Sequence, residues 1–433
     1  MPSQLNEIDV INMGCSKNLV DAELLARQLE VNGYHVNFDP VKPKGKIVII
    51  NTCGFIGDAK EESIEQILKF AEAKKKKKID KLLVMGCLSE RYINDLPNEI
   101  PEVDKFYRKF AWKDIISDLG YAFMPTCSLQ HKISTPAHYA YVKISEGCNR
   151  RCAYCAIPLI TGSYKSRSIE DIVNEVEWLV SQGVKEFQII AQDLSYYGKD
   201  LYGEYSIAKL VERIADIKGV EWIRLHYAYP TDFPYDLLRV IRERDNVCKY
   251  LDLAFQHIDD EVLKNMRRHI TEEETYELIR RIREEVPGIH LRTTLMVGFP
   301  GESETQFEKL LEFVRKVRFE RMGAFQYCEE EDTPAAKLKD DVSPEDKEQR
   351  QERLMTEQES IAEELNESKI GKVFKVIIDR KEGDYYYGRT EFDSPEVDPE
   401  VLIPVSDQTL SIGAFYQVQI VDYDYFDLIG KVI

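Results

Sequence analysis

The stretch YVKISEGCNRRCAYC (141–155) joins a short apolar run to three closely spaced cysteines, Cys148, Cys152 and Cys155. The run YVKIS is typical of a strand, so the C-x3-C-x2-C motif lies on the loop that follows it. Three thiolates on one loop can hold three irons of a four-iron four-sulfur (4Fe-4S) cluster and leave the fourth iron open to a cofactor or substrate. A structural zinc site, the alternative, needs a fourth Cys or His with its own short spacing, and none follows nearby. The motif therefore predicts an open iron–sulfur cluster.

Strand and helix patterns alternate six times from this stretch onward. The predicted strands are 141–145, 186–192, 222–228, 250–256, 291–299 and 321–327. Helical stretches separate them, and Ser168 and Thr271 are predicted N-caps because acidic residues follow each in the first turn. Six βα units favour a partial (β/α) barrel of the TIM type over an open doubly wound sheet. A charged helix over 344–368 then leads to Gly371.

Active sites of such barrels lie on the loops that follow the strands. Residues able to bind a ligand recur there: Gln192-Asp193, Tyr229-Pro230, Gln256-His257 and GFPGE (298–302). Gly298 and Gly301 let the backbone approach a ligand, and the helix that starts after them favours anionic groups, although a plain turn and cap is the simpler interpretation. For His257, a structural hydrogen-bonded role and a catalytic role stay equally open.

The first ~125 residues show the pattern of a parallel sheet covered by helices. Apolar runs at 8–14, 46–52 and 81–86 alternate with helical stretches, of which one stops at Gly33 and one is predicted to be capped by Asp58. Cys15, Cys53 and Cys87 each stand at the carboxyl end of one of these runs. Such ends gather at one edge of a parallel sheet, which favours a second three-cysteine iron–sulfur cluster over three inert buried cysteines. Cys127, Cys248 and Cys328 have no comparable partners and are expected to be structural.

The last ~60 residues change to short strands with turn signals between them, which predicts a five-stranded all-β barrel of the oligonucleotide-binding kind. The expected domains are therefore 1–125, 134–364 and 367–433. Residues 372–433 hold six basic and twelve acidic side chains. A module that grips RNA needs a basic face, so this acidic balance suits a basic protein partner better than a nucleic acid.

The composition fits a folded chain that works in the cytoplasm. The 433 residues contain 58 Lys and Arg against 77 Asp and Glu, a net charge of −19, with 43% hydrophobic residues and nine cysteines. Global disorder is excluded, and nine cysteines are too few for a disulfide scaffold of this length. The sequence has no membrane-length apolar run, and its first residues lack the layout of a signal peptide. We therefore expect a soluble, cytoplasmic protein with no membrane partner.

At Cys148, Cys152 and Cys155 the sequence resembles the radical S-adenosylmethionine (radical SAM) enzymes. The resemblance implies that the amino and carboxylate groups of SAM chelate the open iron and that the cluster passes an electron to release a 5′-deoxyadenosyl radical. It also implies the SAM contacts, for which the matching positions are Tyr154, Gln192, Asp193, Gly298, Gly301 and Glu302.

Two three-cysteine sets, a radical SAM barrel and a small carboxyl-terminal barrel resemble the methylthiotransferase family over nearly the whole chain, with a last module of the TRAM type. Five local motifs resemble those of the branch that acts on an aspartate of the twelfth protein of the small ribosomal subunit. They are MGCSKNLVDAE (13–23), AQDLSYYGKD (191–200), YLDLAFQH (250–257), TTLMVGFPGESE (293–304) and EEEDTPAAKL (329–338). Two segments depart from the sequence pattern of the family, and neither contains one of the six cysteines. They are ITGSYKSRS (160–168) and LAFQH (253–257).

The resemblance implies a division of labour between two 4Fe-4S clusters. The cluster on Cys148, Cys152 and Cys155 would cleave SAM so that hydrogen is taken from the β-carbon of the aspartate. The cluster on Cys15, Cys53 and Cys87 would present sulfur, and a second SAM would donate the methyl group. Implied partners are a basic ribosomal protein, an electron donor such as flavodoxin or ferredoxin, and a sulfur source. A tRNA methylthiotransferase and a non-catalytic iron–sulfur electron carrier stay as alternatives.

Overall fold

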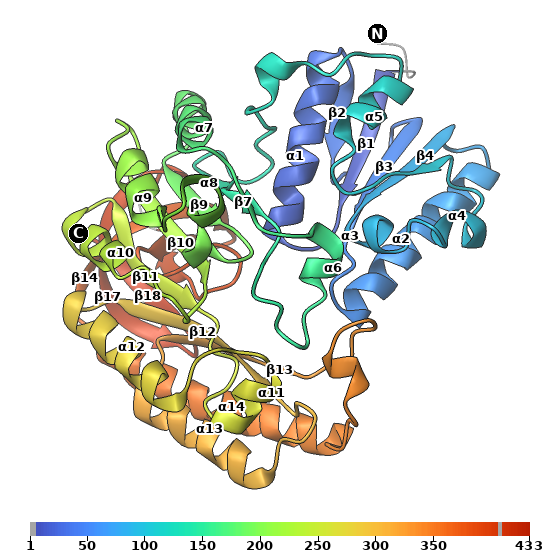
Figure 1. Ribbon diagram of the computed structural model, residues 1–433. Coiled ribbons are helices and arrows are strands. Elements are labelled where there is room, and N and C mark those ends of the chain that lie inside the picture. Colours follow the sequence, from blue (N-terminus) through green and yellow to red (C-terminus); the bar gives the residue numbers. More distant parts are fainter. Residues whose placement is uncertain (1–5, 406–408) are drawn as a thin grey trace.

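The computed structural model describes residues 6–405 and 409–433. Residues 1–5, part of the segment used against a signal peptide, and Asp407, one of the acidic residues of the last module, lie outside these ranges. Figure 1 shows an amino-terminal α/β body beside a larger α/β body that carries the carboxyl-terminal barrel. In the described part of the chain, every helix is too short or too polar to cross a membrane.

The amino-terminal body is a five-stranded parallel sheet in the order β2-β1-β3-β4-β5. Its elements are β1 (Glu7–Asn12), α1 (Ser16–Val31), β2 (His35–Phe38), β3 (Ile47–Thr52), α2 (Gly57–Lys75), β4 (Lys81–Gly86), α3 (Cys87–Arg91), α4 (Leu96–Glu99), β5 (Lys105–Phe106) and α5 (Trp112–Asp118). Apolar side chains of α1 and α5 cover one face of the sheet and those of α2 cover the other. The predicted parallel α/β fold is confirmed.

Two details of this body differ from the sequence analysis. Strands β2 and β5 were not predicted, because they have only four and two residues and so show little periodicity. The prediction that Asp58 caps the second helix is wrong, since Ile56 is the N-cap and no side chain caps this end. Asp58 instead lies in the first turn, where its charge still favours the helix dipole.

The second body is a six-stranded parallel sheet in the order β13-β12-β11-β10-β9-β6. Among the described residues no pairing closes β6 onto β13, so the predicted partial barrel is confirmed. The strands are β6 (Tyr139–Lys143), β9 (Glu186–Ile190), β10 (Trp222–Ala228), β11 (Val247–Leu253), β12 (His290–Val297) and β13 (Arg321–Gln326).

Helices alternate with these strands. They are α6 (Ile157–Thr161), α7 (Ile169–Ser181), α8 (Lys199–Tyr202), α9 (Ile207–Ala215), α10 (Asp236–Glu243), α11 (Asp260–Asn265), α12 (Glu272–Glu285), α13 (Glu304–Val317) and α14 (Pro344–Glu367), and the short strands β7 (Ser145–Glu146) and β8 (Lys165–Ser166) flank α6. Of these helices, α7, α9, α10, α12, α13 and α14 pack against the sheet through the main apolar core. Both predicted caps are present, because Ser168 accepts the N–H of Asp171 and Thr271 forms a capping box with Glu274.

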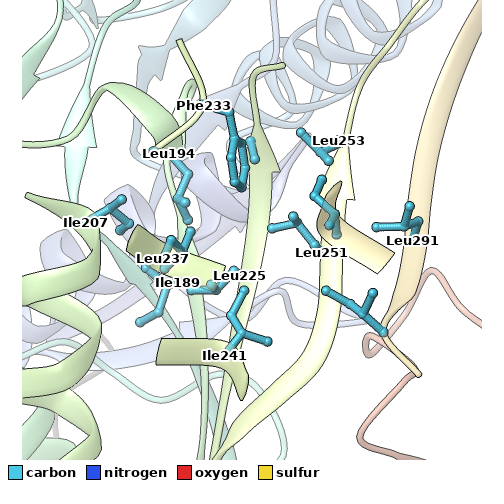
Figure 2. Packing of buried hydrophobic residues seen from close by; sticks show 14 of the residues in the cluster. Ile189, Leu194, Ile207, Leu225, Phe233, Leu237, Ile241, Leu251, Leu253 and Leu291 are labelled. Atoms are coloured by element: carbon cyan, nitrogen blue, oxygen red, sulfur yellow. The ribbon is translucent and has the colours of Figure 1, made fainter. Parts of the chain in front are cut away.

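The core of the partial barrel lies between strands and helices. Figure 2 shows Ile189, Leu225 and Leu251 from three neighbouring strands, with Leu237 and Ile241 of α10 packed against them. Full burial of such a side chain is worth about 1.5–3 kcal/mol, so this layer fixes the strands and hence the loops at their carboxyl ends.

The carboxyl-terminal module is a closed barrel in the order β14-β15-β16-β18-β17, in which β17 pairs back onto β14. Its strands are β14 (Val373–Glu382), β15 (Tyr385–Thr390), β16 (Val401–Pro404), β17 (Phe415–Asp424) and β18 (Asp427–Val432). The predicted five-stranded barrel is confirmed, although β18 was not singled out from the sequence. The boundaries of the three domains stay a prediction.

The segment 389–398 of this module closes the amino-terminal end of the partial barrel. Every strand of the six-stranded sheet supplies a contact. From β6, Tyr139 and Tyr141 donate to Glu396 at 3.0 and 3.1 Å; from β9, Glu186 pairs with Arg389 at 2.7 Å; and from β10, Arg224 donates to the Glu391 carbonyl at 2.6 Å. From β11, Tyr250 donates to Asp398 at 2.9 Å, and Arg292 of β12 and Arg321 of β13 pair with Asp398 and Asp393 respectively. The open end of the barrel is therefore filled by polar groups that satisfy one another.

The segment 389–398, called the plug below, shows what some of the acidic residues of this module do. The acidic residues of 372–433 were expected to face a basic partner, but Asp379, Glu391, Asp393, Glu396 and Asp398 bind the chain itself. The reason is that the barrel strands present arginines at the same end. Five of the twelve acidic side chains of residues 372–433 thus have a structural role within the chain.

Replacing Asp393 with Asn should cost about 3 kcal/mol of unfolding free energy at pH 7, because it leaves buried Arg321 unpaired. Burial opposes the Asp393 charge, but Arg321 and Lys369 lower its pKa from 3.8 to about 2. The stabilisation is therefore complete above about pH 4 and is lost as the pH falls from 3.8 towards 2. Urea unfolding of both proteins across this range measures the difference, with Asp384→Asn at an exposed position of the same module as control. Equal effects of the two substitutions at pH 7 would contradict the plug.

Candidate iron–sulfur and cofactor site

The loop with Cys148, Cys152 and Cys155 is held by backbone hydrogen bonds from three directions. The Cys148 N–H donates to the Gly162 carbonyl at 3.2 Å, the Ala153 N–H donates to the Met266 carbonyl at 2.9 Å, and the Ala335 N–H donates to the Ala153 carbonyl at 2.8 Å. Gly147 enters the loop at φ +72°, and a Cβ there would lie 2.2 Å from the Ser163 carbonyl oxygen. Glycine is therefore required just before the first cysteine.

Buried cationic and aromatic groups surround these thiols. Arg268 is 4% exposed, and its guanidinium lies 3.9 Å from the Cys152 sulfur and 3.4 Å from the Tyr154 hydroxyl. The Tyr229 hydroxyl lies 3.7 Å from the same sulfur, with Arg268 and Arg150 stacked on its ring. Sequence reasoning missed Arg268, because only the fold brings residue 268 to the cysteine loop.

The thiols of this loop need a cationic partner to ionise. Burial raises the pKa of Cys148 to about 12 and raises that of Cys155 above its ordinary value. Burial takes away the water that would stabilise a thiolate. Iron binds thiolates, so its positive charge would stabilise them in place of water. Three soft donors on one short loop, with Arg268 to offset the negative charge of a cluster, fit a 4Fe-4S cluster well.

The residues predicted to contact SAM fall into two groups. Tyr154 and Asp193 lie next to the triad, since Tyr154 is in reach of Arg268 and buried Asp193 accepts from Arg150 Nε at 2.6 Å. Gln192 precedes Asp193 on the loop after β9 and is half-buried. The turn with Gly298 and Gly301 is placed against the triad loop by Phe299, which packs in one cluster with Ala153.

Glu302 is held inside that turn. Its carboxylate accepts the Gly298 N–H at 2.9 Å and pairs with Arg350 at 2.9 Å, and burial raises its pKa to about 7 against these two partners. The Gly301 N–H donates to Asp341 at 2.7 Å. His257 is fully buried, accepts the Asp259 N–H at 3.0 Å and has its pKa lowered to about 3 by burial, which favours its structural role. The side chain of Glu302 thus has partners of its own in this structure.

The second triad gathers at the carboxyl edge of the amino-terminal sheet. Cys15 is the N-cap of α1, Cys53 follows β3 and Cys87 is the first residue of α3. Gly14 has φ +89°, and a Cβ there would lie 2.9 Å from the Cys53 sulfur, so the first two loops touch directly. Cys87 is buried beside Asn18, which lies 3.9 Å from its sulfur. The structure therefore brings all three predicted cysteines together.

A polar network fixes the three loops to each other. Asn18 donates to the Met13 and Thr52 carbonyls at 2.7 and 3.2 Å, and Thr52 donates to the Met85 carbonyl at 2.6 Å. Ser63 of α2 accepts the Cys53 N–H at 3.0 Å and donates to its carbonyl at 3.0 Å. Two of these bonds, from Asn18 to Thr52 and from Thr52 to Met85, join loops more than 30 residues apart, so the geometry of the triad depends on the whole sheet edge.

Lysine charges act on this triad, and sequence reasoning did not find them. Burial alone would raise the pKa of Cys15, but Lys17, the N–H of Asn18 and Lys109 hold it below its ordinary value. Lys109 is 2% exposed, and its own pKa is raised by Asp21 and Cys87 against the effect of burial. No sequence signal marks Lys109, whose partner Asp21 lies far along the chain.

Elements that carry the two triads touch each other at the contact between the bodies. Cys87 packs against Ala156 and Ile160. Ala156 directly follows Cys155 and is the N-cap of α6, and Ile160 lies within that helix. Figure 1 shows α6 beside α3. A buried charge network crosses the same contact, because Asp21 pairs with Lys109 at 3.4 Å and with Lys143 of β6, which also pairs with Glu146. The arrangement can hold two clusters near a common space.

No three His, Cys, Asp or Glu side chains within residues 6–405 and 409–433 converge closely enough to hold one metal ion. In a 4Fe-4S cluster each thiolate binds a different iron, so its ligands stand farther apart than those of a single ion. The finding therefore argues against a single-ion site and does not bear on clusters. The remaining cysteines differ from expectation in part, since Cys248 is buried under the carboxyl-terminal module whereas Cys127 is half-buried and Cys328 is exposed.

Three family models match the chain: an uncharacterized protein family (UPF0004) over residues 7–107, the radical SAM superfamily over 142–314 and the TRAM domain over 370–433. Among solved structures, the radical SAM methyltransferase TsrM from Kitasatospora setae matches with a TM-score of 0.56 at 14% identity, covering 76% of this chain and 77% of that one. At this identity the likeness shows the fold alone.

Relatives of known name match at much higher identity. The ribosomal protein uS12 methylthiotransferase RimO of Phocaeicola vulgatus is 62% identical over 99% of both chains. The protein of the same name from Christiangramia forsetii is 48% identical over 98% of this chain and 94% of its own. With both cysteine triads in place and this identity over its full length, the chain belongs to the RimO family of ribosomal protein uS12 methylthiotransferases.

Proposed function

We propose that this protein is a radical SAM methylthiotransferase that adds a methylthio group to an aspartate of ribosomal protein uS12. The observation that carries the proposal is the packing of Cys87, from one cysteine triad, against the helix that follows Cys155 of the other. Family membership supports the uS12 substrate, because the named relatives are uS12 methylthiotransferases.

The proposed ligands of one 4Fe-4S cluster are Cys148, Cys152 and Cys155, and those of the second are Cys15, Cys53 and Cys87. When bound, the first cluster and SAM supply radical chemistry that can remove hydrogen from an unactivated carbon, which no side-chain acid or base can do. The proposed SAM contacts are Tyr154, Gln192, Asp193, Gly298 and Gly301 near the first triad, and Glu302 supports them by holding the turn.

The residues of this chain prepare that chemistry in three ways. Arg268 keeps positive charge beside Cys152, and the rings of Tyr229 and Tyr154 exclude water around it. Lys109 does the same for the second triad. The plug at the other end of the barrel holds the strands from which the site loops extend.

Further partners complete the proposal. The reaction needs electrons, for which a flavodoxin or ferredoxin is the proposed donor, and a source of sulfur. We propose that the protein acts in the cytoplasm, where ribosomal proteins are reached, and that nucleic acid is not its direct substrate.

Removing the second triad should separate the two half-reactions. In a protein with Cys15, Cys53 and Cys87 replaced by Ala, SAM cleavage should stay within a fewfold of normal while methylthiolation is abolished. Quantification of 5′-deoxyadenosine and mass spectrometry of uS12, under anaerobic reduction, measure both. A folded variant that loses both activities would contradict the division of labour.

The same assay separates the proposed substrate from the alternatives. Reduced wild-type protein is incubated with uS12 and with tRNA separately, and a methylthio mass increase is expected on an aspartate of uS12 only. A mass increase on tRNA alone would overturn the substrate. Absence of 5′-deoxyadenosine under every reducing condition would support a non-catalytic electron carrier.

Gly147→Ala should remove the first cluster and leave the second. The added Cβ would meet the Ser163 carbonyl at 2.2 Å, so the loop before Cys148 must move. Bound iron should fall to about half of the wild-type content, and SAM cleavage should be lost. Gly203→Ala is the matched control, because Gly203 has φ +80° but nothing within 4 Å of the added atom. Full iron content in the Gly147 variant would contradict the proposed role of this loop.

A further inference from the structure

The segment 327–341, called the strap below, connects the partial barrel to the amino-terminal body. It lies between β13 and α14, and Figure 1 shows it passing beside the start of α2. Its buried residues include Tyr327, Glu330, Thr333 and Ala335. Most of the strap is the motif EEEDTPAAKL, which no step of the proposed function uses.

Glu330 of the strap joins two elements that carry the second triad. Its Oε2 atom accepts from Lys60 at 3.0 Å and from Arg91 at 2.8 Å. Lys60 lies near the start of α2, the helix that follows Cys53. Arg91 is the last residue of α3, the helix that begins with Cys87. One carboxylate from the barrel therefore binds the elements next to two of the three cysteines.

The strap also binds the loop of the first triad and the turn with Gly301. The Ala335 N–H donates to the carbonyl of Ala153, which lies within the cysteine loop, at 2.8 Å. Tyr327 and Ala335 pack in one buried cluster with Ala153. Asp341 accepts the Gly301 N–H at 2.7 Å. One short segment thus touches the supports of both triads and the turn predicted to contact SAM.

The strap ties one face of the amino-terminal body, and α1 ties the other. Helices α1 and α2 cover opposite faces of the amino-terminal sheet. On the α1 side, Asp21 pairs with Lys143 of β6. On the α2 side, Glu330 binds Lys60 and Arg91. Two ties on opposite faces prevent a pivot about either one, and such a pivot would change the separation of the triads.

The chemistry of the Glu330 contact favours placement over net stability. The side chains of Glu330 and Arg91 are 4% and 5% exposed, so both charges are taken out of water. The cost of this desolvation offsets most of the attraction between buried charges, so such a pair adds little net stability. Removing one partner is nevertheless strongly unfavourable, because the other charge is left buried and unpaired. A carboxylate shared by two cations therefore permits one arrangement of the two bodies.

We propose that Glu330 is a positioning residue that sets the place of the second triad relative to the first, through Arg91 and Lys60. The inference rests on the proposed function, in which both triads act on one substrate. A misplacement of about 1 Å can cost about a hundredfold in rate. Loss of the tie should therefore impair methylthio transfer, which uses both triads, and spare SAM cleavage, which uses the first. A merely structural role, the competing interpretation, predicts that both activities fall together or that neither falls.

Four variants of the full chain test the proposal. Glu330→Gln keeps the shape of the side chain and removes its charge, and Arg91→Met removes one partner. Glu329→Gln, at an exposed neighbour on the strap, is the first control. Glu320→Gln is the second, because it breaks a pair with Arg283 of α12 and leaves the strap intact.

Hydrogen exchange measures the tie itself, without any activity. Amide exchange in 87–92 and in 329–338 should rise at least about threefold in Glu330→Gln and Arg91→Met, because the strap and α3 separate more often. Both controls should exchange as wild type does in these two segments. Unchanged exchange in the Glu330 and Arg91 variants would overturn the tie.

The reconstituted enzymes measure what the tie does. Without uS12, all four variants should form 5′-deoxyadenosine within about twofold of wild type. With uS12, the amount of 5′-deoxyadenosine formed per methylthio group should rise about tenfold in Glu330→Gln and Arg91→Met and stay at the wild-type value in both controls.

An unchanged ratio, or an equal loss of SAM cleavage and methylthiolation in folded protein with full iron content, would overturn the positioning role of Glu330. Wild-type protein that methylthiolates no uS12 would contradict the proposed function instead. The exchange measurement separates these two failures, because it reports the tie in the absence of any reaction.

Discussion

The packing of Cys87 against Ala156 and Ile160 is the contact on which the site depends. It joins the first turn of α3, which carries Cys87, to the short helix α6, which follows Cys155. One element of each triad therefore packs against an element of the other triad. Because packed interiors allow little sliding, this contact sets the separation of the two proposed clusters. The buried pair of Asp21 with Lys143 crosses the same boundary, and Lys109 of the amino-terminal body pairs with the same carboxylate.

The barrel is open at one end for chemistry and closed at the other by the chain itself. At the carboxyl ends of the strands lie the cysteine loop and the Gly298 turn. At the amino ends, Arg389 pairs with Glu186 and Asp393 with Arg321, and both pairs are buried. A partial barrel lacks the last strand pairing that would brace it, and this plug supplies contacts to all six strands instead. The carboxyl-terminal module therefore supports the site from a distance.

Much of this structure could be predicted from the sequence because its strands and helices show local patterns of apolar residues. The strands around Cys53, Cys87 and Cys148 are strong apolar runs, and the carboxyl ends of parallel strands share an edge, so both triads followed. The short strands β2 and β5 show too little periodicity to be found. Asp58 was misassigned because an acidic residue in a first turn looks like a cap.

What the sequence could not reveal depends on contacts between distant residues. Arg268 beside Cys152, Lys109 beside Cys87 and Lys17 over Tyr227 are ordinary charged residues until the fold brings them together. For the same reason, the charge count of the last module did not reveal that five of its acidic side chains pair within the chain.

The central claim is that the two triads hold clusters close enough to act on one substrate. Electron paramagnetic resonance of the doubly reduced protein tests it most directly, because nearby paramagnetic clusters broaden each other's signals and speed each other's relaxation. The wild-type spectrum should show this interaction, and it should differ from the sum of the spectra of two variants that each lack one triad. A wild-type spectrum equal to that sum, in protein with full iron content, would contradict the account.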